Sequence, residues 1–203
     1  MIFSELLDLI KWDLRRNRGM HLDGMRAKLL LIEIRVEQYV YEKIHTSHLK
    51  SPFLIWYIVR FLGSIYQWLL CNSQISGSVN IGKGLYLPHP QNIVITHMST
   101  IGEFATIYHN TTIAWNGFEG KTTRVKSPKI GNNVLIGNGV IIIGRVDIGD
   151  FVLIGAGTIV TRSVPDHSRV TSPMPNVTHR PPSEAAAQPG SEEHMGDPYS
   201  IYR

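Results

Sequence analysis

Between residues 75 and 164 an aliphatic side chain recurs at every sixth position, and this period constrains the fold more than any other feature. An α-helix repeats every 3.6 residues and a strand every two, so neither produces a six-residue period. Such a period is typical of a parallel β-helix, in which each unit is a short strand and three units close one triangular coil. We therefore predict a mainly β fold of thirteen units, a little over four coils. The predicted core residues are Ile75, Ile81, Leu87, Ile95, Ile101, Ile107, Ile113, Ile130, Ile136, Ile142, Ile148, Ile154 and Val160.

Two insertions interrupt the period. Two residues are inserted between Leu87 and Ile95, and eleven between Ile113 and Ile130. The longer insertion must leave the coil as a loop, and long loops on a rigid scaffold are commonly binding elements. We expect it to bind substrate or an anionic partner, with a merely solvated loop as the alternative. The candidate contact residues are Trp115, Lys121, Arg124 and Lys126.

The period divides the chain into three parts. Residues 1–74 show apolar residues at helical spacing and are predicted to be helical. Residues 75–170 form the predicted β-helix, and residues 171–203 are rich in proline and alanine, which predicts a mobile tail without chemistry.

Residues 53–70 are almost entirely apolar, and they could be covered in more than one way. Arg60 near the middle of the segment argues against a helix that spans a membrane. We favour a helix buried against its neighbours or at a subunit interface. An interfacial helix is the other reading, and it predicts a peripheral contact with anionic membranes, helped by Arg15, Arg16 and Arg18.

Composition excludes several classes of protein. The single cysteine, Cys71, provides neither a disulfide framework nor a CxxC metal site, so we expect no metal and a reducing compartment. The N-terminus lacks the basic segment of a signal peptide, which predicts a cytoplasmic protein. The net charge of +4 suits an anionic ligand but is too diffuse to predict nucleic-acid binding.

Two histidines are the strongest candidates for chemistry. His89 and His109 each lie two positions after a core aliphatic residue, in units that are one full coil apart. We therefore expect them on the same edge of the coil, facing outward, with His97 on the next edge. Histidine is the side chain best suited to proton transfer near neutral pH.

The chain resembles the hexapeptide-repeat acyltransferases, and within them the serine-acetyltransferase-like branch, over about residues 20–175. The matching motifs are Ile81-Gly82-Lys83-Gly84-Leu85, Leu87-Pro88-His89, Ile93-Val94-Ile95, Pro128-Lys129-Ile130-Gly131, Ile154-Gly155-Ala156-Gly157-Thr158-Ile159-Val160 and Ser163-Val164-Pro165.

This resemblance implies a left-handed parallel β-helix, a homotrimer, and acetyl-CoA as a cosubstrate rather than a permanently bound cofactor. It implies that His89 is the general base, with His109 as a second base or a residue that positions the acceptor. Residues implied to border the CoA groove are Gly137, Asn138, Gly139, Gly155, Ala156, Gly157 and Arg162.

Three positions depart from serine acetyltransferases. Gln74 and Pro88 replace aspartates, and Ser127 replaces a histidine, among residues that orient the base or hold the amino acid. We therefore expect an O-acetyltransferase that acts on a sugar hydroxyl of a capsular or other surface polysaccharide, or of its precursor. The alternatives are a serine O-acetyltransferase of cysteine biosynthesis and a non-catalytic β-helix scaffold.

Overall fold

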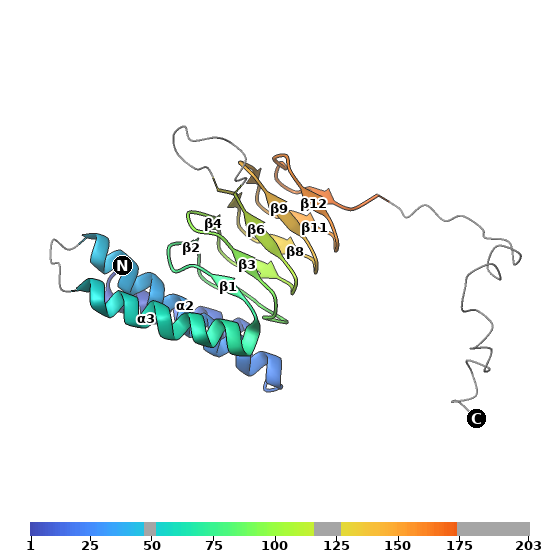
Figure 1. The fold of residues 1–203 in the computed structure, drawn as a ribbon. Helices are drawn as coiled ribbons and strands as arrows, with labels where there is room; N and C mark the ends of the chain where they lie inside the picture. The colour runs from blue at the N-terminus through green and yellow to red at the C-terminus, as the bar shows by residue number, and fades with distance from the viewer. Residues whose placement is uncertain (47–51, 116–126, 174–203) are drawn as a thin grey trace, which may run out of the picture. The chain divides into compact units, whose positions relative to one another are not determined.

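Helices form the N-terminal part of the chain, and short parallel strands form most of the remainder (Figure 1). The computed structural model describes residues 1–46, 52–115 and 127–173. The helices are α1 (Phe3–Arg16), α2 (Leu22–Thr46) and α3 (Pro52–Tyr66), and α3 continues into a π-helix, η1 (Gln67–Cys71). These helices lie within residues 1–74, the part of the chain that the apolar spacing predicts to be helical.

The strands stack into three parallel sheets. The first sheet has the order β1-β3-β6-β9-β12, the second β10-β7-β4-β2 and the third β13-β11-β8-β5. The strand bounds are β1 (Gln74–Ile75), β2 (Asn80–Ile81), β3 (Val94–Ile95), β4 (Thr100–Ile101), β5 (Thr106–Ile107), β6 (Thr112–Ala114), β7 (Lys129–Ile130), β8 (Leu135–Ile136), β9 (Ile141–Ile143), β10 (Asp147–Ile148), β11 (Leu153–Ile154), β12 (Ile159–Val160) and β13 (Arg169–Val170).

Every predicted core position is buried. All thirteen aliphatic residues of the repeat are at most 4% exposed, and they form one continuous cluster inside the coils. Within the sheets these residues pair with their counterparts in the neighbouring coil, as Ile130 does with Ile148. The left-handed parallel β-helix with an N-terminal helical region is therefore confirmed.

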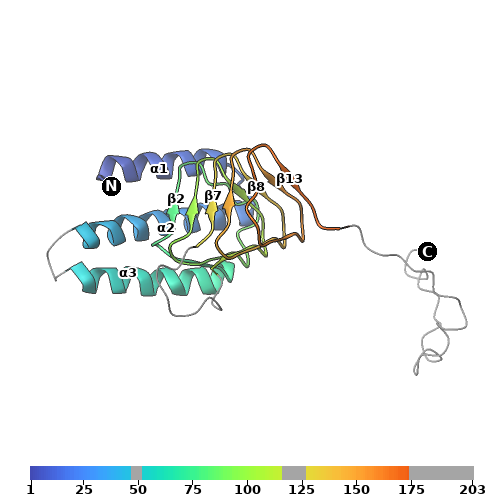
Figure 2. The ribbon, with the colours of Figure 1, turned by 90° about the horizontal axis from the view of Figure 1, so that it is seen from above.

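Helix α2 lies across the open end of the first coil (Figure 2). Its residues Ala27, Leu30, Leu31 and Ile34 are at most 1% exposed and belong to the same apolar cluster as the coil interior. The core of the β-helix therefore does not end at its first coil but continues into the helices. This contact removes from water the apolar surface that the end of a solenoid otherwise exposes.

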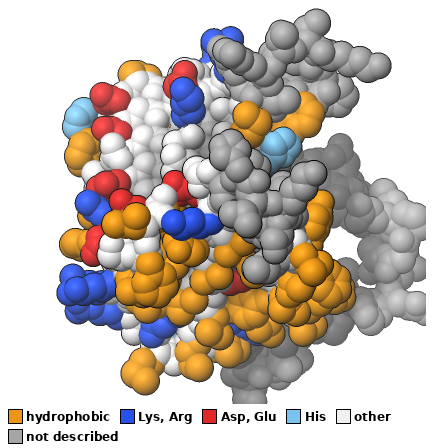
Figure 3. Space-filling model, turned by 90° about the vertical axis from the view of Figure 1, so that its left-hand side faces the viewer, with side chains coloured by type: hydrophobic (Ala, Val, Ile, Leu, Met, Phe, Trp, Pro, Cys, Tyr) orange, Lys and Arg blue, Asp and Glu red, His pale blue; other side chains and the backbone are white. Residues whose placement is uncertain are grey.

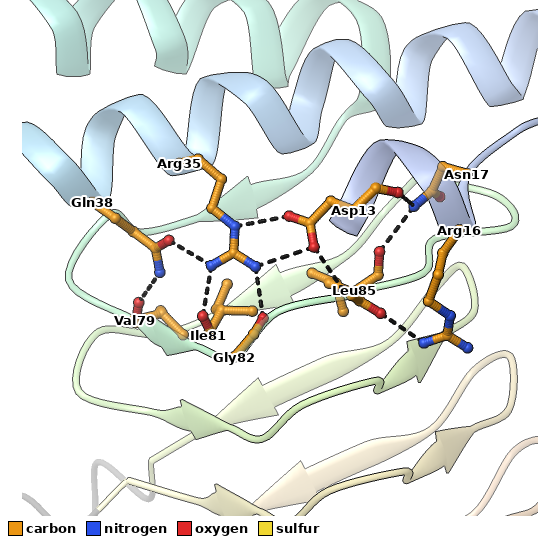
Figure 4. Close-up of polar contacts among 10 residues, drawn as sticks. Asp13, Arg16, Asn17, Arg35, Gln38, Val79, Ile81, Gly82 and Leu85 are labelled. Atoms are coloured by element: carbon orange, nitrogen blue, oxygen red, sulfur yellow. Dashed lines mark hydrogen bonds and ion pairs between the residues drawn. The ribbon is translucent and has the colours of Figure 1, made fainter. Parts of the chain in front are cut away.

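The backbone of the first coil has no strand on its outer side, and helix side chains satisfy its polar groups (Figure 4). Arg35 donates to the carbonyl oxygens of Ile81 and Gly82, and Gln38 donates to that of Val79. On α1, Asp13 accepts a hydrogen bond of 2.9 Å from the Leu85 amide.

Asn17 follows α1 and completes this capping of the coil. Its amide nitrogen lies 2.9 Å from the carbonyl oxygen of Leu85, and its amide oxygen lies 3.1 Å from the nitrogen of Leu87. Side chains from the helices thus take the place of a neighbouring strand.

Arg35 is the centre of this arrangement. The side chains of Arg35 and Asp13 are 1% and 0% exposed, and Arg35 Nε lies 2.8 Å from Asp13 Oδ2. A buried charge is tolerated only when it is paired and its hydrogen-bonding groups are satisfied, and both conditions hold here. The pair therefore fixes α1 and α2 against the first coil.

Helix α3 and η1 leave apolar side chains uncovered in the single chain. Figure 3, which views the molecule from its helical end, shows hydrophobic side chains gathered there. The exposed residues are Leu54, Tyr57, Ile58, Phe61, Leu62, Ile65, Trp68, Leu69 and Leu70. The single chain therefore covers only part of α3, and burial of the remainder at a subunit interface stays a prediction. Within the described ranges, no helix is long and apolar enough to cross a membrane.

We predict that Arg35→Met lowers the free energy of unfolding by about 3–5 kcal/mol, because it leaves the Asp13 carboxylate buried without its partner. Urea denaturation at fixed protein concentration measures the loss. Arg145→Met is the matched control, since Arg145 is exposed on the β-helix. Equal unfolding midpoints for the two variants would contradict the prediction.

Candidate active site

The turns that lead from the third sheet to the first form one edge of the β-helix, which we call the histidine–glycine edge. It contains His89, His109, residues 137–139 and residues 155–157. Backbone hydrogen bonds tie successive turns together: Asn110 N donates to Gln91 O, Gly139 N to His109 O, and Gly157 N to Asn138 O. The edge is therefore a regular column with one turn per coil.

His89 and His109 come together at the start of this column, as their spacing predicts. Their ring centroids are 5.5 Å apart and the rings are nearly perpendicular. The His89 side chain is 49% exposed and thus accessible to a substrate. His109 is partly buried, and its Nδ1 has no hydrogen-bond partner among the described residues.

A carboxylate from the helical region contacts His89. Asp23, in the first turn of α2, places Oδ2 2.9 Å from His89 Nδ1. Asp23 Oδ1 accepts a hydrogen bond of 2.6 Å from Gln91 Nε2. The hydrogen bond with His89 is the largest cause that lowers the pKa of Asp23 below its usual value. An ionised carboxylate only accepts hydrogen bonds, so this contact requires a proton on Nδ1 of His89, and in the neutral ring Nε2 is then the unprotonated nitrogen.

Sequence reasoning missed Asp23 and Gln91. No periodicity relates Asp23 to a turn 66 residues later, and Asp23 by itself has the signature of an ordinary acidic residue in a first helical turn. Gln91 lies two positions after His89 on the same turn. This short distance along the chain was the only feature of the sequence that could have indicated Gln91 as a site residue.

The glycine part of the edge presents bare backbone. Gly139 and Gly157 have φ values of 69° and 67°, a conformation that L side chains rarely adopt. A Cβ atom at Gly157 would meet nothing within 4 Å, so the space beside it is open. A ligand can therefore approach the backbone closely along the coils that follow His109.

Other candidate residues lie on a different edge. Trp115 directly follows β6, and Arg162 lies between β12 and Val164, so both are in turns from the first sheet to the second. His97 shares that edge, with its ring centroid 6.4 Å from that of Trp115. The structure therefore does not bring Arg162 or Trp115 to His89 within one chain. Lys121, Arg124 and Lys126 lie outside the described residues.

A cavity of about 460 Å³ opens between η1 and the first sheet. Its walls include Gln67, Trp68, Gln74 and Asn92, so amide groups dominate its polar surface. His89 and Asp23 are not among its lining residues, and the cavity is therefore separate from the candidate base.

Cys71 is not a candidate nucleophile. It is 1% exposed, and burial raises the pKa of its thiol to about 11. The thiolate is the reactive form of cysteine, so Cys71 is unreactive near neutral pH.

Comparisons with known proteins agree with this geometry. Residues 127–162 match the family model described as bacterial transferase hexapeptide (six repeats). The chain is 31% identical over 132 residues to the serine acetyltransferase of Synechococcus elongatus, an alignment that spans 63% of this chain and 53% of that protein. It is 32% identical over 129 residues to the serine acetyltransferase of Helicobacter pylori, spanning 63% of this chain and 71% of that protein.

Solved structures share the fold. Serine acetyltransferase isoform 3 of Entamoeba histolytica, in complex with cysteine, superposes with a TM-score of 0.70 at 21% identity, covering 91% of this chain and 64% of that chain. Serine acetyltransferase of Brucella abortus, in complex with coenzyme A, gives a TM-score of 0.68 at 20% identity, covering 85% of this chain and 67% of that chain.

The expected polysaccharide acceptor is wrong, because the matching relatives are serine acetyltransferases. That expectation depended on Gln74, Pro88 and Ser127, which differ from the two aspartates and the histidine of serine acetyltransferases. Position 74 is glutamine rather than aspartate, yet His89 still has a carboxylate partner, because Asp23 contacts it from α2. The Helicobacter pylori enzyme, 32% identical over 71% of its own length, decides the family. The chain belongs to the serine-acetyltransferase-like branch of the hexapeptide-repeat acyltransferases.

Proposed function

We propose that the chain is an acetyl-CoA-dependent O-acetyltransferase whose acceptor is the hydroxyl group of L-serine. The observation that carries the proposal is the His89 imidazole, which is half exposed and bonded to a carboxylate through Nδ1 at the start of an open glycine edge. The names of the relatives support serine as the acceptor and acetyl-CoA as the donor.

The proposed reaction is a direct transfer. Nε2 of His89 takes the proton of the acceptor hydroxyl as its oxygen attacks the thioester carbonyl carbon. The tetrahedral intermediate collapses, the carbon–sulfur bond breaks, and the proton on His89 passes to the departing thiolate of CoA. The products are the acetyl ester and free CoA, and no covalent intermediate forms on the protein.

Acetyl-CoA would lie along the histidine–glycine edge. Residues 137–139 and 155–157 follow His109 in register, one coil after another. The absence of side chains at Gly139 and Gly157 lets an extended donor lie close to the backbone of this edge. His109 would position the acceptor, because its ring is next to that of His89.

The active molecule would be a homotrimer. Trp115 and Arg162 lie on a different edge from His89 in one chain, so a second copy must bring them to the base. The apolar surface of α3 and η1 provides area that assembly can cover.

The peripheral contact of residues 53–70 with anionic membranes stays a prediction. The exposed aromatic and aliphatic residues of α3 suit an interfacial position. Arg16 is not available to such a surface, because its guanidinium donates to the carbonyl oxygen of Gly84 at 2.6 Å. Arg15 and Arg18 are exposed.

His89→Ala is expected to lower kcat about 100-fold or more, because general-base catalysis contributes at least this factor. Affinity for acetyl-CoA should remain nearly unchanged. His167→Ala is the control, since His167 is exposed in the turn between Val164 and β13, away from both the histidine–glycine edge and the edge of Trp115. If His89→Ala keeps more than about half of the activity, His109 becomes the candidate base.

The acceptor is tested by thiol release from acetyl-CoA, with the acetylated product identified by mass spectrometry. We expect L-serine to be acetylated well above the rate without acceptor, and the His89→Ala variant to lose this activity. Acetylation of another hydroxyl compound with serine inactive would overturn the acceptor. If no hydroxyl compound stimulates thiol release, the non-catalytic scaffold is favoured.

Flotation with anionic liposomes at low salt tests the membrane contact. We expect the wild-type protein to float and Phe61→Glu to remain soluble, because a charge opposes insertion of an apolar surface. Ile159→Glu is the matched control: Phe61 and Ile159 are both 65% exposed, but Ile159 lies on β12. A wild-type trimer that stays wholly in the soluble fraction would show that α3 serves only assembly.

A further inference from the structure

Among the residues that the structure describes, Asp23 is the carboxylate hydrogen-bonded to His89, and it comes from outside the β-helix. Its Oδ2 lies 2.9 Å from His89 Nδ1, within normal hydrogen-bond distance. The Asp23 side chain is 25% exposed, about half the exposure of the His89 side chain at 49%. The histidine therefore has one shielded side, which faces α2, and one accessible side.

The carboxylate is held in place by further contacts. Gln91 Nε2 donates to Oδ1 at 2.6 Å, and Arg26 Nη1 lies 3.5 Å from the same oxygen. Asp23 also lies in the first turn of α2, where the helix dipole favours a negative charge. Each carboxylate oxygen thus has its own partner, and the group cannot rotate away from His89 without losing the contact with Gln91.

The other candidate groups lack this arrangement. Gln74, on β1, has an exposed side chain and carries no charge. Nδ1 of His109 has no hydrogen-bond partner among the described residues. Of the two adjacent histidines, His89 is therefore the one whose Nδ1 is hydrogen-bonded to a described carboxylate.

We propose that Asp23 is the positioning residue of the catalytic base: it accepts the Nδ1 proton of His89 and thereby keeps Nε2 unprotonated for the acceptor hydroxyl. This inference rests on the proposed function. When His89 takes the acceptor proton, the Asp23 carboxylate stabilises the resulting imidazolium. Helix α2 therefore completes a site whose other residues belong to the β-helix.

Asp23→Asn tests the positioning role. The amide has the shape of the carboxylate but can donate to Nδ1, which selects the wrong imidazole tautomer. We expect kcat to fall about 10²- to 10⁴-fold, with KM for acetyl-CoA changed by less than about twofold because the variant leaves the glycine edge intact. Asp23→Glu restores an acceptor and should recover part of the loss. Asp8→Asn is the control, since Asp8 is exposed on α1.

Nitrogen NMR of ¹⁵N-histidine-labelled protein provides a readout that needs no turnover. With the ring neutral, we expect the proton of His89 on Nδ1 in the wild type and on Nε2 in Asp23→Asn, with the signal assigned through His89→Gln. If Asp23 has only a structural role, Asp23→Asn should lower thermal stability and leave this proton on Nδ1.

The two measurements must agree. An unchanged tautomer, or a changed tautomer with unchanged kcat, overturns the role of Asp23. A wild-type protein that does not acetylate serine overturns the proposed function instead, and the tautomer then still decides the contact between Asp23 and His89.

Discussion

The first coil of a β-helix has backbone amides and carbonyls with no neighbouring strand, and this protein satisfies them with side chains. Arg35, paired with Asp13 and almost fully buried, donates to two carbonyl oxygens of that coil. A buried guanidinium with several fixed acceptors tolerates little displacement, since each lost contact leaves a polar group unsatisfied. The position of α2, and with it that of Asp23, therefore depends on the ion pair between Arg35 and Asp13.

Helix α2 carries both Arg35, which contacts the first coil, and Asp23, which contacts His89. The two residues are twelve positions apart, about 18 Å along the helix at 1.5 Å per residue. Arg35 fixes the helix against the coil, and Asp23 contacts the turn that holds His89. Loosening the ion pair would thus also disturb the orientation of the base, although no residue of the pair contacts His89.

The β-helix was predictable from sequence because one rule, burial at every sixth residue, applies to each coil independently of the rest of the chain. The same rule placed His89 and His109 side by side, since residues one coil apart must stack. The contact between Asp23 and His89 could not be predicted from this period, because it joins a helix outside the repeat to a turn 66 residues later. The acceptor expectation depended on single residues at fixed positions in the sequence, and the serine acetyltransferase relatives overturn it.

The stacked turns also limit how the candidate site can vary. Each residue of one coil pairs in register with its counterpart in the next, so adding or removing a coil shifts the edge by one strand spacing, about 4.8 Å. The separation between His89 and the far end of the glycine edge can change only in such steps, unless a turn is rebuilt. Evolution or design can therefore alter the length of this edge only by whole coils, while substitutions within a turn alter its chemistry.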